Sequence, residues 1–130
     1  MAFLPKHILA VDDNEGVRDV IALMLEEGGY RVTVASDGLS MRETLQRDDP
    51  VDAIVLDALM PGEQSAALAR HARDLNIPVV MISGSHDKII FAVDNGLQLL
   101  RKPFRYQELI DALNLAFESG DAGQRADPTI

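Results

Sequence analysis

Three carboxylates stand where two apolar runs of the sequence end. Asp12 and Asp13 follow the run 8–11, and Asp57 closes the run 53–57. If they meet, two carboxylates about 4 Å apart repel by roughly 4 kcal/mol at an effective dielectric of ~20, so the cluster needs protonation or a cation. All-oxygen ligands suit Mg²⁺, which commonly pairs one or two carboxylates with a phosphate. The acids therefore predict a Mg²⁺ site in which Asp57 is the nucleophile that forms an aspartyl phosphate.

A hydroxyl and an ammonium group complete this set. Ser83 follows the apolar run 79–82, and Lys102 follows the short run 99–101. They would supply a hydrogen bond and a positive charge to the equatorial oxygens of a transferring phosphoryl group. Each residue alone also fits a plainer role, since acids cap helices, serine ends strands as a turn residue and lysine solvates surfaces.

Alternating strands and helices must bring these residues together. The hydrophobic periods predict strands over 8–11, 31–35, 53–57, 79–82 and 99–101, and helices over 15–27, 39–46, 65–75, 87–95 and 106–118. Asn14 is the predicted N-cap of the first helix, and Gly28-Gly29 its stop. This alternation predicts a three-layer α/β fold with a five-stranded parallel sheet. In the flavodoxin-like (βα)5 order 2-1-3-4-5, the first and third strands are neighbours and the acids converge.

Length and composition limit the remaining possibilities. The 130 residues fit one domain over 1–118, followed by a flexible C-terminal tail over 119–130 that is rich in Gly, Asp and Ala. The net charge of −9 argues against direct binding of nucleic acid, and the absence of cysteine excludes thiol chemistry. No apolar run suits a membrane span or a signal peptide, so we expect a cytoplasmic protein.

The ordered motifs resemble the receiver domain of two-component response regulators, over residues 7 to about 118. They are Val11-Asp12-Asp13-Asn14, Leu56-Asp57-Ala58-Leu59-Met60-Pro61, Ser83 and Lys102-Pro103-Phe104. The resemblance implies that Asp57 accepts a phosphoryl group from a histidine kinase or a histidine phosphotransfer protein.

The resemblance also implies the roles of the other site residues. Asp13 and Asp57 would bind Mg²⁺ directly together with the backbone carbonyl of Leu59, and Asp12 would help through water. Ser83 and Lys102 would contact the phosphate, and the Lys102-Pro103 bond would be cis.

By the same resemblance, the protein would be a regulatory switch that turns over no external substrate and only phosphorylates itself and slowly loses the phosphoryl group. Phosphorylation would change the surfaces after the fourth and fifth strands, so as to regulate a protein partner or to pass the phosphoryl group on. The sequence does not identify that partner. We expect a stand-alone protein that is a monomer or a weak dimer.

Three departures from the usual receiver pattern stand out. Leu99 occupies the place of a Tyr or Phe that turns inward on phosphorylation, and Ser65 occupies the place of a common glycine. Lys102 follows Ser83 by 19 positions, a few fewer than in most receivers. We therefore expect the fourth helix to be short, displaced or partly unwound, as in a subset of stand-alone receivers.

Two other functions remain open. The first is a receiver-like binding module that is never phosphorylated. The second is a phosphatase of the haloacid dehalogenase type, although this class expects Asp-x-Asp after the first strand and a cap insertion. The glycine fingerprints of nucleotide-binding loops are missing.

Several other side chains are expected to have roles outside the phosphate site. His7, His71 and His86 show no ligand spacing and are expected to be solvated. Phe104 is expected in the core. The polar face of the first helix, comprising Asn14, Glu15, Arg18 and Ala22, is either the docking face for a kinase or an ordinary solvated face.

Overall fold

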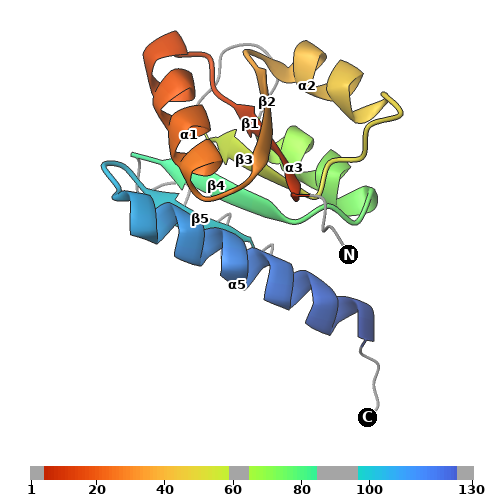
Figure 1. The fold of residues 1–130 in the computed structure, drawn as a ribbon. Coiled ribbons are helices and arrows are strands. Elements are labelled where there is room, and N and C mark those ends of the chain that lie inside the picture. Colours follow the sequence, from red (N-terminus) through yellow and green to blue (C-terminus); the bar gives the residue numbers. More distant parts are fainter. Residues whose placement is uncertain (1–4, 59–64, 85–96, 126–130) are drawn as a thin grey trace.

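Five parallel strands form the centre of the computed structural model, in the order β2-β1-β3-β4-β5 (Figure 1). The strands are β1 (His7–Val11), β2 (Arg31–Ala35), β3 (Ala53–Asp57), β4 (Val79–Ser83) and β5 (Gln98–Arg101). The structure describes residues 5–58, 65–84 and 97–125, with side chains up to residue 118. The predicted fold and strand order are confirmed. Because all five strands are parallel, their carboxyl ends lie along one edge.

Helices cover both faces of this sheet (Figure 1). The helices of the described ranges are α1 (Glu15–Glu27), α2 (Gly38–Leu45), α3 (Ser65–Asp74) and α5 (Tyr106–Arg125). Ile21 of α1 and Leu113 of α5 belong to one buried cluster, and Met41 of α2 and Leu68 of α3 belong to another. The two clusters are the two faces of a three-layer α/β fold. The helix predicted over 87–95 lies outside the described residues.

The strands supply both clusters by simple alternation. In β1, Ile8 and Ala10 join the α1–α5 side, whereas Leu9 and Val11 join the α2–α3 side. Because successive strand residues point to opposite faces, a strand between two helical layers must be apolar throughout. β1 and β3 are neighbours with Val11 opposite Leu56, so the residues that follow Val11 emerge beside Asp57.

Local signals determine the bounds of α1. The Asn14 side chain accepts a hydrogen bond of 2.9 Å from the Val17 amide, as an N-cap should. The helix ends at Glu27 with Gly28 as its C-cap, and Gly29 has a φ of 89°, which residues with a Cβ rarely adopt. Both predicted signals are confirmed.

The final helix is longer than predicted. We expected it to end at Glu118, and α5 continues to Arg125. Ser119, Gly120 and Gly123 weaken helix propensity, which is why the pattern suggested a stop. Once a helix has formed, however, each further residue adds one hydrogen bond without a new nucleation cost.

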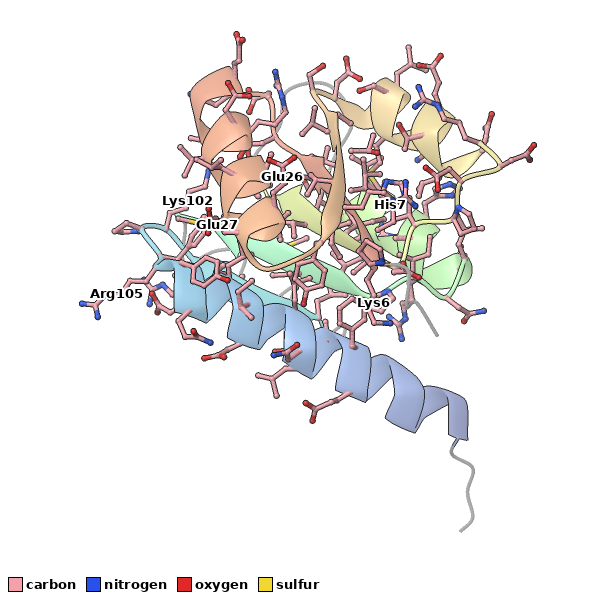
Figure 2. The ribbon with its side chains drawn as sticks, viewed as in Figure 1. Lys6, His7, Glu26, Glu27, Lys102 and Arg105 are labelled. Atoms are coloured by element: carbon pink, nitrogen blue, oxygen red, sulfur yellow. The ribbon has the colours of Figure 1, made fainter. Side chains whose placement is uncertain are left out.

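The prediction that His7 is solvated is wrong. Only 2% of the residue is exposed, and both ring nitrogens have partners. Nδ1 donates to the Pro50 carbonyl at 2.9 Å, which leaves Nε2 to accept from the Thr33 hydroxyl at 2.7 Å. His7 therefore ties β1 to β2 and to the chain that enters β3. Figure 2 shows it far from Lys102, which belongs to the opposite end of the sheet.

An ion pair lies beside His7. Both guanidinium nitrogens of Arg31 donate to the Asp49 carboxylate at 2.7 Å. These hydrogen bonds lower the pKa of Asp49 below its ordinary value and raise that of Arg31.

None of the helices in the described ranges combines the length and the apolar composition that a membrane span requires.

Candidate functional site

Three carboxylates meet at the carboxyl edge of the sheet, as predicted. Oxygen atoms of Asp12, Asp13 and Asp57 all lie within 4.8 Å of one another. Asp12 and Asp57 are buried, with 1% and 5% of their surface exposed, whereas Asp13 is exposed. Asp12 leaves β1 and Asp57 ends β3, so the parallel register of these neighbouring strands creates the cluster.

One buried oxygen of this cluster lacks a hydrogen bond. Among the described residues, Asp12 Oδ2 has no hydrogen-bond partner, although it is shielded from solvent. An unsatisfied buried acceptor costs free energy, and a charged one costs more. The cluster therefore offers oxygen atoms only, and one of them makes no hydrogen bond within the described residues.

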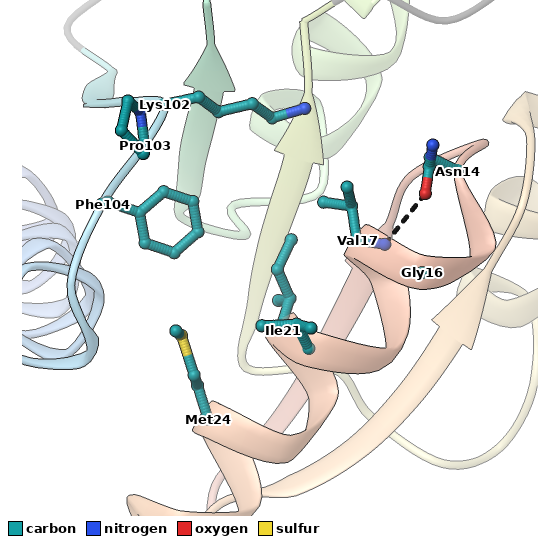
Figure 3. A pocket seen from close by; sticks show the side chains of 9 residues that line it. Asn14, Gly16, Val17, Ile21, Met24, Lys102, Pro103 and Phe104 are labelled. Carbon is teal, nitrogen blue, oxygen red and sulfur yellow. Dashed lines mark hydrogen bonds between the residues drawn. The ribbon is translucent and has the colours of Figure 1, made fainter.

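Lys102 is the cation that the chain itself brings to the cluster. Its Nζ lies 3.5 Å from Asp57 Oδ1 and 3.7 Å from Asp12 Oδ2. The residue follows β5 directly, and its bond to Pro103 is cis, as the resemblance implied. Figure 3 shows the side chain extending from this loop past the end of a strand towards the N-terminal part of α1. Among the described residues, this ammonium group thus lies near both buried carboxylates of the cluster.

Hydrogen bonds hold both the side chain and the backbone of Asp12 in place. The Asn14 amide donates to Asp12 Oδ1 at 2.9 Å, and Arg18 Nη1 donates to the Asp12 carbonyl at 3.0 Å. From the sequence, Arg18 is predicted only to lie on the polar face of α1, so its contact with the Asp12 carbonyl is new. The signal that could have revealed its contact is spacing, because an arginine in the second turn of α1 can reach back over the first turn to the end of β1.

Two serines lie at the same edge. Ser83 is the last residue of β4, is buried, and its carbonyl accepts a hydrogen bond of 3.0 Å from the Lys102 amide. β3 and β4 pair so that Asp57 faces Ile82, which puts Ser83 one residue beyond Asp57. Ser65 begins α3, and its hydroxyl donates to the Asp57 carbonyl at 2.7 Å. In the sequence, Ser65 stands out only because receivers commonly have glycine at this position.

The remaining candidates fall into two groups. Leu59, the expected source of a carbonyl ligand, and His86 lie outside the described residues. Leu99 is partly buried and packs against the α2–α3 cluster, and Phe104 packs against the α1–α5 cluster as predicted. His71 is partly exposed near the end of α3.

A family model described as "Response regulator receiver domain" matches residues 8–114. The chain belongs to this family. The match includes every residue of the acidic cluster, as well as Ser65, Ser83 and Lys102. The receiver domain is a regulatory domain. Because its relatives are response regulators, we assign the chain to a two-component system.

Curated relatives agree with this assignment. The receiver domain is 36% identical over 102 residues to the transcriptional regulatory protein CseB of Streptomyces coelicolor, covering 75% of this chain and 43% of that protein. It is 38% identical over 108 residues to the response regulator MprA of Mycobacterium leprae, covering 79% and 47% of the two chains. The chain thus spans about half the length of the curated relatives it matches.

Solved structures of similar proteins show the same architecture. The chemotaxis protein CheY4 of Vibrio cholerae is 26% identical, with a TM-score of 0.74 over 87% of this chain and 99% of that chain. A response regulator receiver domain protein from Clostridium thermocellum is also 26% identical, with a TM-score of 0.80 over 89% and 97%. The acidic cluster of this chain therefore belongs to a receiver fold.

An apolar hollow adjoins the acidic cluster (Figure 3). Its volume is about 720 Å³, and it lies between α1 and the loop that joins β5 to α5. Val17, Val20, Ile21 and Met24 line it from α1, and Phe104 lines it from the other side. Half of the Val20 surface is exposed, so this apolar surface is open to a partner.

Proposed function

We propose that the protein is the phosphoacceptor switch of a two-component system and that Asp57 takes a phosphoryl group from a histidine kinase or a histidine phosphotransfer protein. One observation carries this proposal: Asp57 ends a buried strand within 4.8 Å of two further carboxylates and 3.5 Å from the Lys102 ammonium. Packing alone does not require two further acids beside a buried aspartate.

Asp57 acts as the nucleophile. One of its carboxylate oxygens forms a bond to phosphorus while the bond between phosphorus and the histidine nitrogen breaks. The bonding electron pair stays on that nitrogen, which takes up a proton, and the product is an aspartyl phosphate. Lys102 offers its positive charge to the phosphoryl oxygens, and the Ser83 hydroxyl offers a hydrogen bond. Apart from its own phosphorylation and slow loss of the phosphoryl group to water, the protein turns over no substrate.

Mg²⁺ is the proposed cofactor. Within the described residues, Asp12 Oδ2 lacks a hydrogen bond and three carboxylates meet, and this set of oxygen donors fits a hard divalent cation. Asp13 and Asp57 would hold the ion directly, with the Leu59 carbonyl, and Asp12 through water. When bound, Mg²⁺ offsets the charge that the phosphoryl group adds to the acidic cluster.

The switch acts through the loops after β4 and β5. Ser83 ends β4, Lys102 follows β5, and a backbone hydrogen bond joins them. A phosphoryl group adds charge and acceptor oxygens between them, so it favours one arrangement of these loops over another. A protein partner then reads the shifted population or receives the phosphoryl group. Leu99 stands where receivers usually have a Tyr or Phe, so this switch does not use the inward rotation of an aromatic ring at that position.

The phosphoryl donor docks over α1. The apolar hollow between α1 and Phe104 lies next to Lys102, so a helix that packs there would bring its histidine to Asp57. The acidic cluster and the net charge of −9 fit a partner that is a protein and not a nucleic acid. The cytoplasm is the proposed location, because histidine kinases phosphorylate their receivers there.

Phosphorylation with a small donor tests the proposal. The protein is incubated with acetyl phosphate and Mg²⁺, and intact mass is recorded over time. We expect a single phosphoryl adduct that is absent when Mg²⁺ is chelated and absent in Asp57→Ala. Asp48→Ala, which removes an exposed acid outside the cluster, should keep the adduct. A protein that never forms the adduct would be the non-phosphorylated binding module, and steady release of phosphate with little adduct would be a phosphatase.

A further inference from the structure

A buried hydroxyl links the start of α3 to the backbone of Asp57. Ser65 is 4% exposed, and its Oγ donates to the Asp57 carbonyl at 2.7 Å. The two residues are eight positions apart, at the two ends of the chain segment that connects β3 to α3. The contact therefore joins the last residue of a buried strand to the first residue of a helix.

We propose that Ser65 is a positioning residue, whose hydroxyl holds the Asp57 main chain and thereby sets the divalent-ion affinity of the acidic cluster. This inference rests on the proposed function, because it concerns the same ion. Ser65 does not belong to the cluster of three carboxylates, so its effect on the ion acts through Asp57.

The physical reason lies at the end of the strand. Asp57 has ladder pairing with β4 through Ile82, and the Ala58 amide is held by the Ile82 carbonyl at 2.8 Å. The chain leaves the sheet directly afterwards, and the Ser65 hydroxyl fixes the Asp57 carbonyl at this point. A fixed carbonyl restricts the peptide plane next to the Asp57 Cα and so restricts the direction of its side chain. Metal ligands that are fixed in this way bind more tightly because less freedom is lost on binding.

The carboxylate itself needs such support. Asp57 faces two other acids within 4.8 Å, and their mutual repulsion favours conformations in which the side chains separate. Lys102 holds Asp57 Oδ1 only at 3.5 Å and is itself 32% exposed. The backbone contact from Ser65 is short and buried, and it does not depend on ionic strength.

The test measures Mg²⁺ binding to the unphosphorylated protein by isothermal titration calorimetry. We expect Ser65→Ala to raise the dissociation constant for Mg²⁺ about tenfold, as loss of an outer contact to a metal ligand typically does. Ser65→Thr keeps the hydroxyl and should restore an affinity close to that of the wild type. Ser65→Gly also lacks the hydroxyl and gives the same comparison if Ser65→Ala does not fold.

The matched control is Thr44→Val. Thr44 is equally buried, and its hydroxyl donates to the Ser40 carbonyl at 2.9 Å within α2, a helix that adds no residue to the cluster. Its loss should lower the melting temperature and leave Mg²⁺ affinity unchanged. The rate of phosphorylation by acetyl phosphate is a second measurement. At low Mg²⁺ the Ser65→Ala variant should be phosphorylated more slowly than the wild type, and at saturating Mg²⁺ the two rates should be similar.

Two outcomes would overturn the inference, and they are distinguishable. If wild type and Ser65→Ala bind Mg²⁺ equally well while only the melting temperature falls, Ser65 has a purely structural role and the proposed function stands. If the wild-type protein itself binds no Mg²⁺ and takes no phosphoryl group, the proposed function fails and this inference fails with it.

Discussion

The three aspartates of the cluster are the same residue type in three different environments. Asp12 is buried with an unsatisfied oxygen, Asp57 is buried beside an ammonium group and a serine-held carbonyl, and Asp13 is exposed. These environments support the proposed roles, in which Asp57 reacts with the phosphoryl group and the other two aspartates help to hold a cation. The cluster is also a source of instability when no cation is bound, and this can be measured.

Asp13→Asn should stabilise the protein when divalent ions are removed. Two charges 4.8 Å apart repel by roughly 3 kcal/mol at an effective dielectric of ~20, and solvent around the exposed Asp13 reduces the gain to about 1 kcal/mol. Urea unfolding in EDTA measures the change. With saturating Mg²⁺ the advantage should vanish, because the wild type then gains more from the ion.

Asp48→Asn is the control for this prediction. It removes an exposed acid that is outside the cluster, so the free energy of unfolding should change by less than about 0.5 kcal/mol. A loss of stability in Asp13→Asn in EDTA would mean that the three carboxylates do not repel one another in solution.

Polar N-cap residues explain where the helices α1 and α2 begin. α2 begins with a capping box, in which the Asp37 side chain accepts from the Ser40 amide at 2.8 Å and the Ser40 side chain accepts from the Asp37 amide. The Ser40 amide and the Ser40 hydroxyl both donate to the Asp37 carboxylate, and these two hydrogen bonds lower the pKa of Asp37. The structure places the start of α2 one residue earlier than predicted, at Gly38, because Asp37 is the cap.

The lowered pKa of Asp37 predicts how the stability of the protein depends on pH. An unfolded aspartate titrates near pH 3.9, so the contribution of Asp37 is fully present above about pH 4 and is lost as the pH falls through the lower folded value. Asp37→Asn keeps an oxygen for the Ser40 amide and does not titrate. Its stability should match the wild type at pH 7 and should decrease less than that of the wild type between pH 4 and pH 2.

Urea unfolding of both proteins at pH 7 and pH 3 measures this difference. Asp37→Ala serves as the control, since it should be less stable than the wild type at pH 7 because the cap is lost. If Asp37→Asn and the wild type lose stability in parallel in acid, folding does not lower the pKa of Asp37.

For the whole molecule, two apolar clusters on opposite faces of one sheet hold the reactive edge in place. The N-terminal chain and the last helix close the α1–α5 face, where Lys6 Nζ lies 4.7 Å from the centre of the Phe117 ring. Within the described side chains, the buried residues of α5 are Leu109, Ala112, Leu113 and Ala116. The helix itself continues to Arg125.

A chain that ends at Glu118 should therefore remain folded. Because the four buried side chains that the structure describes in α5 and the Lys6–Phe117 contact are kept, its free energy of unfolding should stay within about 1 kcal/mol of that of the full chain. Urea unfolding followed by circular dichroism measures this. A chain that ends at Asp111 loses three of the four buried residues and should lose cooperative unfolding. A loss above about 2 kcal/mol in the longer truncation would show that residues 119–130 belong to the domain.

The sequence by itself determined the alternation of strands and helices, the strand order through its family resemblance, and the positions of the acids at strand ends. These features follow from local causes: apolar periods, caps such as Asn14, and glycines such as Gly29. Three features became visible only in the folded chain: Asp12 Oδ2 has no hydrogen-bond partner among the described residues, Ser65 holds the Asp57 carbonyl, and His7 is buried. Each of these depends on side chains that are brought together by strand register and helix packing, over distances in the chain that no local pattern records.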